Sequence, residues 1–176
     1  MAAVQTRRGI FATLVKHHAL NAIVDFVLIL VAFKWLYTSD IGIYILFGVT
    51  TFIYLTGIYP YTYSQAKIDL RKNNRYDWLA PLKIGGVASL LILVPPLIHL
   101  LLNRLIPAAG EYFGVLARFW NYPFFFFIYG KNGDFFNVAA LLFIITLPVI
   151  TAYISYYCGV KKIDLSEKIY KVFNKK

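Results

Sequence analysis

Three stretches of the chain contain no Asp, Glu, Lys or Arg and are long enough to cross a lipid bilayer. They are residues 41–63, 84–102 and 135–160, with lengths of 23, 19 and 26 residues. A helix needs about 20 predominantly apolar residues to span the hydrocarbon core of a bilayer. Because the runs are continuous and do not alternate apolar with polar residues, they predict membrane-spanning helices rather than the strands of a barrel.

A fourth apolar run, residues 19–33, carries a single carboxylate, Asp25. The whole chain is 60% hydrophobic and only 15% charged, whereas about a quarter of the residues of a soluble domain are charged. We therefore predict an all-α polytopic integral membrane protein in which residues 1–176 form a single membrane domain. The four predicted transmembrane helices cover about residues 14–36, 41–63, 81–104 and 135–159.

The lysines and arginines gather on one side of the predicted spans. Of the 18 such residues, three lie in 7–16, five in 67–83 and six in the tail 161–176, which makes fourteen. Cytoplasmic loops of membrane proteins carry the excess of basic residues. We therefore expect a multi-pass protein of the cell membrane with both termini and the loop 64–80 in the cytoplasm, and with residues 105–134 as an external loop.

Two segments, residues 56–70 and 151–165, align without a gap, and both contain the tetrapeptide KIDL. Each lies where an apolar run meets a basic cluster. The pattern predicts two helical hairpins related by internal duplication, with an insertion in the external loop of the second. The alternative is that KIDL arose independently at two membrane boundaries, where lysine is favoured.

The second KIDL copy lies in a lysine-rich tail, residues 159–171, with the sequence GVKKIDLSEKIYK. This tail resembles the GYKGISLSEK-like, lysine-rich ending of small four-helix membrane proteins of Gram-positive bacteria, chiefly clostridia. The resemblance covers about a dozen residues and departs from that pattern at Val160, Lys162 and Asp164. It implies a bacterial membrane protein with its tail at the inner leaflet, and it brings no activity with it.

The loop 105–134 is rich in aromatic residues and in helix breakers, among them Pro107, Gly110 and Pro123. We expect it to lie in the outer membrane interface, with a short helix over residues 111–120. The alternative is a re-entrant segment packed into the bundle, because irregular backbone is tolerated inside a membrane where protein covers it. The candidate residues of an external interface are Arg118, Phe119, Trp120 and Tyr122.

Asp25 lies well inside the first predicted span, where a charge is unstable unless it is paired or hydrated. At helical spacing, His18, Asn21 and Asp25 share one face and form a candidate intramembrane polar stripe. Asp25 could bind a proton or a cation there, or it could form a structural hydrogen bond with another helix. His17 and His18, beside Lys16, are expected to contact lipid headgroups.

No metal, cofactor or catalytic site is predicted. His99 lies near the opposite end of a span from His18, so the two histidines do not make a metal site. Cys158 is the single cysteine, which excludes a disulfide within one chain. The sequence contains no GxSxG, Walker A, HExxH or CxxC motif, and we predict that the protein is not an enzyme.

Two sets of basic residues are expected to contact anionic lipid headgroups at the cytoplasmic face, each residue contributing about 1 kcal/mol. The first set is Lys67, Arg71 and Arg75, and the second is Lys168, Lys171 and Lys175. The second set shares the tail with an apolar stripe, which predicts an amphipathic helix within residues 161–176. Beside a membrane these residues favour lipid, and no nucleic-acid partner is expected.

The leading functional hypothesis is a non-enzymatic transport or channel-type protein, or the membrane subunit of a transport complex. Four helices enclose little space, so we expect a homo-oligomer or a protein partner in the membrane. The alternative is an accessory, binding or immunity-type membrane protein that uses the external aromatic loop. A lipid-modifying enzyme is a third hypothesis, for which the sequence offers no residues.

Overall fold

The computed structural model describes residues 7–36, 40–73, 75–129 and 137–163, and all regular elements in these ranges are helices. Four helices are long: α1 (Arg7–Leu36), α2 (Asp40–Asn73), α3 (Ala80–Leu105) and α6 (Val138–Val160). Between α3 and α6 lie α4 (Pro107–Trp120), the 3₁₀ helix η1 (Tyr122–Phe124) and α5 (Phe125–Tyr129). Each long helix contains a stretch long and apolar enough to span a membrane. The prediction of an all-α polytopic membrane protein with four spanning helices is confirmed.

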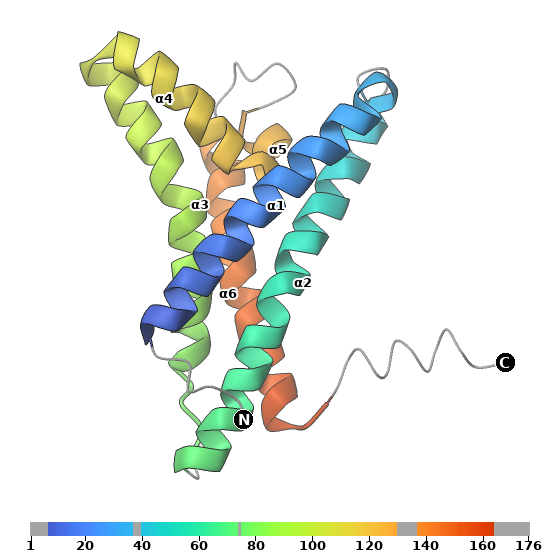
Figure 1. Cartoon of the computed structure of the whole chain (residues 1–176), viewed down its shortest axis with the longest axis vertical. Coiled ribbons are helices and arrows are strands. Elements are labelled where there is room, and N and C mark those ends of the chain that lie inside the picture. The colour runs from blue at the N-terminus through green and yellow to red at the C-terminus, as the bar shows by residue number, and fades with distance from the viewer. Residues whose placement is uncertain (1–6, 37–39, 74, 130–136, 164–176) are drawn as a thin grey trace, which may run out of the picture.

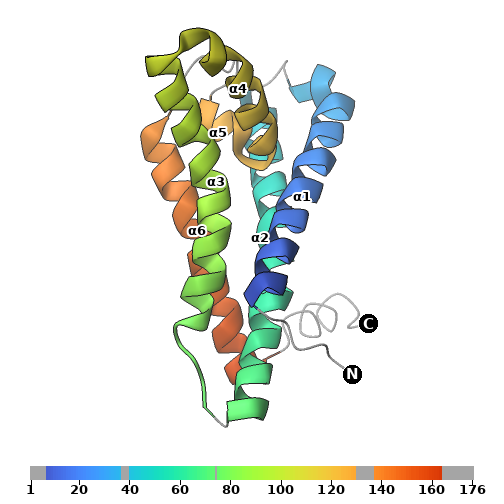
Figure 2. The ribbon, with the colours of Figure 1, turned by 60° about the vertical axis from the view of Figure 1, so that its left-hand side comes forward.

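The four long helices run between the two ends of one bundle (Figure 1). At the end drawn lowest in Figure 1, which we call the lower end, α2 and α6 end and α3 begins. α6 packs along both α2 and α3, and α1 packs chiefly against α2. From the upper end of α3, α4 turns back beside α3, so that α4 and α5 lie between the upper parts of α3 and of the α1–α2 pair (Figure 2).

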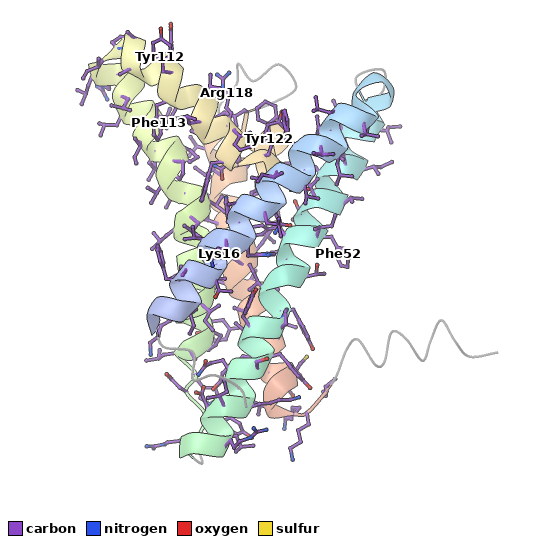
Figure 3. All side chains as sticks on the ribbon, viewed as in Figure 1. Lys16, Phe52, Tyr112, Phe113, Arg118 and Tyr122 are labelled. Carbon is purple, nitrogen blue, oxygen red and sulfur yellow. The ribbon has the colours of Figure 1, made fainter. Side chains whose placement is uncertain are left out.

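Large apolar side chains are abundant on the outer surface of the long helices. Val31 is 82% exposed, Phe52 67% and Leu142 55%, and Phe52 points away from the bundle in Figure 3. Soluble proteins rarely expose extended apolar surface of this kind, whereas lipid tails are as apolar as these side chains. The outer surface therefore agrees with four helices embedded in a bilayer.

Glycines let α6 approach both of its neighbours closely. A Cβ atom added to Gly85 of α3 would lie 2.6 Å from the Cα of Val149. A Cβ atom added to Gly159 of α6 would lie 2.7 Å from the carbonyl oxygen of Tyr63. Because lipid provides no hydrophobic force between helices, close backbone packing at small residues is a main source of their association. These contacts therefore hold α3, α6 and α2 together.

Several helices extend beyond the predicted spans. α2 continues to Asn73 and includes most of the residues expected in the loop 64–80. α1 begins at Arg7, and α4 begins at Pro107, before the short helix predicted for residues 111–120. The tail is described only to Ile163, so its predicted amphipathic helix lies outside the described residues. The internal duplication stays a prediction.

Gly85→Ala should destabilise the protein, and Gly86→Ala should not. The methyl group added at Gly85 meets the backbone of α6, and overpacking of this kind costs about 1–3 kcal/mol. Apart from the adjoining residues and backbone of α3 itself, no described atom lies within 4 Å of a Cβ added at Gly86, and alanine favours a helix over glycine by about 1 kcal/mol. Thermal unfolding of the two purified variants in detergent measures the difference. Equal midpoints would contradict the close contact between α3 and α6.

Candidate functional site

One face of α1 carries polar side chains into the bundle. His18 and Asp25 are fully buried, and Asn21 is 5% exposed. Residues at positions i, i+3 and i+7 of a helix share a face, and α1 packs this side against α2, α4 and η1. The structure therefore places the three residues of the candidate polar stripe together in the protein interior.

His18 joins α1 to two other helices. Its Nδ1 lies 3.0 Å from the Tyr54 hydroxyl oxygen in α2, and its Nε2 lies 2.9 Å from the Trp120 carbonyl oxygen at the end of α4. A carbonyl oxygen only accepts, so Nε2 donates to it, and in a neutral imidazole Nδ1 accepts from the Tyr54 hydroxyl. The imidazole also stacks on the Trp120 ring, with centroids 4.6 Å apart. The expectation that His18 contacts lipid headgroups is wrong, because both ring nitrogens bond to protein.

His17 is also held against α2. Its Nε2 lies 3.0 Å from the Tyr54 carbonyl oxygen, and the Asn21 side-chain amide donates to the His17 carbonyl oxygen at 2.8 Å. A Cβ atom at Gly57 would lie 1.7 Å from the His17 ring. Gly57 therefore provides the space in which this half-buried imidazole bonds to protein, so the headgroup expectation does not hold for His17 either.

Asp25 differs from the two histidines because no described residue forms a hydrogen bond with its carboxyl group. Both oxygens are buried, and neither forms a hydrogen bond within the part of the chain that the structure describes. Two further buried oxygens in the same condition, Thr51 Oγ1 and Asn121 Oδ1, come from α2 and from the residue after α4. A buried charge without a partner is unstable. This carboxyl group therefore requires a bound proton, a cation or water.

The α4–η1–α5 segment enters the bundle from its upper end. A Cβ atom at Gly110 would lie 2.6 Å from the Cα of Asn103 in α3. A Cβ atom at Gly114 would lie 2.6 Å from His99 Nε2. These glycines let α4 pack closely on α3, and Phe124 of η1 is fully buried. The segment is therefore packed into the bundle at its upper end, as the re-entrant arrangement requires, and its position relative to the membrane interface stays a prediction.

Side chains satisfy three carbonyl groups around the end of this segment. Pro95 has no N–H to donate to the Leu91 carbonyl oxygen, and the Trp120 indole nitrogen donates to that oxygen at 2.9 Å instead. The Trp120 carbonyl oxygen accepts from the buried imidazole, and the Thr50 hydroxyl donates to the Pro123 carbonyl oxygen at 2.9 Å. Because an unsatisfied carbonyl away from water costs several kcal/mol, these bonds stabilise the segment in its position within the bundle.

The four residues predicted for an external interface do not share one outward face. Tyr122 packs edge-on against Phe26 of α1, at 5.3 Å between ring centroids, and Phe119 contacts the same ring at 5.7 Å. Trp120 is turned toward α1 and α3. Arg118 is half-buried beside an aromatic ring of α5 (Figure 3). All four side chains therefore pack at least partly against neighbouring rings or helices, and their role in an external interface stays a prediction.

His99 lies apart from the polar stripe. Its ring faces Gly114 of α4 and lies 6.4 Å from the Tyr129 ring. Within the described ranges, no group of three His, Cys, Asp or Glu side chains lies close enough together to hold a metal ion. The structure thus brings His17 and His18 together with Asn21, but it does not add His99 to them.

Asp69, the aspartate of the first KIDL copy, is a structural residue that the sequence patterns do not single out. It is 5% exposed, and it accepts hydrogen bonds from the Gln65 amide at 2.6 Å and from the Tyr156 hydroxyl at 2.8 Å. The backbone N–H of Asp77 donates to the same hydroxyl at 2.9 Å. The network joins α2, α6 and the connection to α3. Of this network, only the hydrogen bond between Gln65 and Asp69 could be expected from the sequence, because the two residues have i, i+4 spacing. The equivalent aspartate of the second KIDL copy, Asp164, lies outside the described residues.

Asp77 lies beside the first turn of α3. Its Oδ1 accepts from the Leu79 N–H at 2.9 Å, and its Oδ2 pairs with the Lys83 ammonium group at 3.2 Å. The pKa of the Asp77 carboxyl is held below its ordinary value, chiefly by the hydrogen bond from the Leu79 N–H and secondly by the hydrogen bond from Lys83. Asp77 therefore remains charged at neutral pH. Its ion pair holds the Lys83 side chain near the first turn of α3.

The basic residues predicted to contact headgroups are exposed where they are described. Lys67, Arg71 and Arg75 lie on or just after the last turns of α2 at the lower end. The ammonium group of Lys67 lies 4.3 Å from the centre of the Tyr63 ring, and its side chain is exposed. The second set, Lys168, Lys171 and Lys175, lies outside the described residues.

The comparisons with known proteins do not extend this description. No protein-family model matches the chain, and neither a curated protein nor a solved structure is significantly similar to it. The class of the protein therefore rests on its own helices, which define an all-α, polytopic integral membrane protein.

Tyr54→Phe should destabilise the protein by about 1–3 kcal/mol, because it leaves the buried Nδ1 of His18 without its donor. The matched control is Tyr44→Phe, since Tyr44 lies on the same helix and is 67% exposed. Its free energy of unfolding should change by less than about 0.5 kcal/mol. Thermal unfolding in detergent compares the two variants. If both unfold at the wild-type temperature, the proposed donor–acceptor pattern at His18 is incorrect.

Proposed function

We propose that this protein is a small, non-enzymatic membrane transport protein in which Asp25 binds the coupling proton or cation. The observation that supports this proposal most directly is the fully buried carboxyl group of Asp25, whose oxygens have no hydrogen-bond partner among the described residues. Ionisable residues inside membrane proteins are rare, and they commonly mark ion pathways and proton relays. A purely structural aspartate is expected to be paired, as Asp69 is.

Polar groups continue from Asp25 along α1 toward the lower end. Asn21 lies about one turn below Asp25, and its amide bonds to the carbonyl oxygen of His17, another turn below. His17 is only half-buried, so the series extends from the buried carboxyl group to a partly accessible imidazole. These groups support a proton route between Asp25 and the lower end.

The re-entrant segment also favours transport over a purely structural role. Irregular backbone at membrane depth occurs where protein covers it or where it lines a pathway, as in channels and transporters. Here η1 contacts both α1, which carries Asp25, and α2. We propose that displacement of the α4–η1–α5 segment gives ions access to Asp25 from the upper end.

We further propose that the lower end faces the cytoplasm of a bacterial cell. The exposed basic residues that support this orientation lie at the ends of three helices that meet there. They are Lys67, Arg71, Arg75, Lys83, Lys161 and Lys162. With an even number of spanning helices, both termini would lie on that side, in agreement with the excess of basic residues in cytoplasmic loops.

A transport pathway would require more than one chain. The centre of the described bundle is filled by large side chains, among them Tyr54, Ile58, Phe124 and Ile144, all at most 1% exposed. Four helices packed in this way leave little room for a solute. We therefore propose a homo-oligomer or a protein partner in the membrane, with anionic lipids at the lower end.

One observation favours the alternative of an accessory, binding or immunity-type protein. The outward side of α4 exposes Tyr112 at 80%, Val115 at 65% and Leu116 at 64%, and Tyr112 projects from the upper end in Figure 3. A partner in or near the outer interface could contact this side of α4. Aromatic residues also anchor helices at a lipid interface without any partner, so this observation supports the alternative less strongly than Asp25 supports transport.

Asp25→Asn should abolish ion-coupled activity and leave the fold intact. Asparagine has nearly the same size as aspartate, but its side-chain amide neither releases nor binds a proton near neutral pH. Proton uptake into proteoliposomes loaded with a pH-sensitive dye, driven by a potassium diffusion potential, should fall to the level of empty liposomes. The infrared carboxyl band of a protonated Asp25 should disappear too, which gives a readout that needs no transported solute.

The control for this variant is Glu111→Gln, which neutralises an exposed carboxylate of α4 and should change neither signal. Thermal unfolding establishes that the Asp25→Asn protein is folded. Proton uptake and an infrared spectrum like those of the wild type would make Asp25 a structural residue and would reject the proposed function.

Cysteines at Arg75 and Tyr112 should be labelled from opposite sides of the membrane. Both side chains are exposed. Arg75 follows α2, which ends at the lower end, whereas Tyr112 lies on α4 at the upper end (Figure 3). The Cys158→Ser background removes the native thiol. In intact cells, a membrane-impermeant maleimide should label Tyr112→Cys, whereas Arg75→Cys should react only after the membrane is permeabilised. The reverse pattern would overturn the proposed orientation, and labelling of both sites from outside would contradict four spans with this helix arrangement.

A further inference from the structure

A lateral groove lies between the lower parts of α1 and α3, on the outside of the bundle. Its lower part has a volume of about 460 Å³ and includes polar side chains near the start of α3. Its upper part has a volume of about 300 Å³ and is apolar. Phe11 of α1 and Val87 of α3 line both parts, so the two parts meet and form one groove.

The lower part of the groove presents groups that can bind a phosphate. Gln65, Asp77 and Lys83 line it, and the side chains of Lys83 and Asp77 are 55% and 46% exposed. An ion pair this exposed is weak, so an anion can compete with Asp77 for the Lys83 ammonium group. Gln65 lines the same part of the groove. Its amide nitrogen already donates to Asp69, and the second N–H of that nitrogen can donate to the anion.

The upper part of the groove suits a hydrocarbon chain. Leu91, Val94, Pro95 and Trp120 line it together with the two shared residues. The indole N–H of Trp120 already donates to the Leu91 carbonyl oxygen, so the ring offers only apolar surface to a ligand. The groove thus changes from polar to apolar along α3, away from the lower end.

We propose that this groove binds one membrane phospholipid with an anionic headgroup. The phosphate lies at Lys83 and Gln65, and an acyl chain extends past Val87 to the Trp120 ring. The change in polarity along the groove has the direction found within one leaflet of a bilayer. Trp78, just before α3, is 51% exposed and fits the interface at the same depth as the headgroup. The basic surface of the lower end favours an anionic lipid.

Such a lipid would contact the structural core of the protein as well as its surface. The acyl chain would end on the ring of Trp120, whose carbonyl oxygen accepts from His18 and whose ring stacks on the same imidazole. Occupancy of the groove would therefore stabilise the inserted end of α4. This proposal does not depend on whether Asp25 binds an ion.

Tryptophan fluorescence can test the proposal directly. Trp35→Phe together with Trp78→Phe leaves Trp120 as the single tryptophan of the chain. The protein is reconstituted in phosphatidylcholine with increasing fractions of phosphatidylglycerol that carries brominated acyl chains, which quench tryptophan on contact. Quenching of Trp120 should saturate at a low fraction of the anionic lipid. Brominated phosphatidylcholine at the same fraction should quench far less.

Variants within this background locate the lipid. Lys83→Gln should raise the fraction needed for half-maximal quenching by about fivefold, the value of one lysine–lipid contact. Lys161→Gln, an exposed lysine at the same end but outside the groove, should change nothing. Val87→Phe narrows the junction of the two parts and should remove the saturable quenching, whereas Leu142→Phe on the outer side of α6 should preserve it.

Two results would overturn the proposal. Quenching that rises in proportion to the brominated fraction, equally for both lipids, would mean that Trp120 meets only bulk lipid. Quenching that depends on the ratio of protein to lipid, and not on the headgroup, would mean that a second copy of the chain covers the groove. Thermal unfolding of each variant excludes loss of fold as the cause of either result.

Discussion

Inside a bilayer no water is present to bond a carbonyl group that a helix leaves free. Such groups lie inside the bundle where α4 ends, and also in α3, where Pro95 leaves the Leu91 carbonyl without its helical donor. His18, Thr50 and the Trp120 indole supply the missing donors. The arrangement of α1, α2 and α3 around the segment depends on these few bonds, because each of them comes from a different helix.

Because water is absent from the bilayer core, a buried aspartate needs a partner within the protein, and the two buried aspartates differ in this respect. Asp69 accepts from Gln65 and Tyr156, and it connects α2 to α6. Asp25 is at least as deeply buried, and no described residue bonds to its carboxyl group. Burial of an unpaired ionisable group reduces stability, and groups of this kind inside membranes are commonly retained for function. The contrast, rather than burial alone, makes Asp25 the residue on which the proposed ion coupling rests.

The outer surface of the bundle is also divided into an apolar part and a basic part. Much of the long helices' outer surface is apolar, as lipid requires, and exposed basic residues lie at the lower end of the described bundle. The groove between α1 and α3 joins the two environments, because it begins at Lys83 and ends on Trp120. Trp120 therefore contributes to the interior through its carbonyl oxygen and its indole N–H, and to the proposed lipid site through its ring.

Local sequence determined the spanning helices, because the length and apolarity of a run suffice to predict a span in a bilayer. It also determined the shared face of His18, Asn21 and Asp25, since helical periodicity follows from spacing alone. The course of α4 was decided only by tertiary structure. Residue 120 meets residue 18, and residue 123 meets residue 50; no local pattern encodes such distant pairs. The depth of the aromatic segment depends on which buried donors meet its free carbonyls, and that becomes apparent only when the helices are packed together.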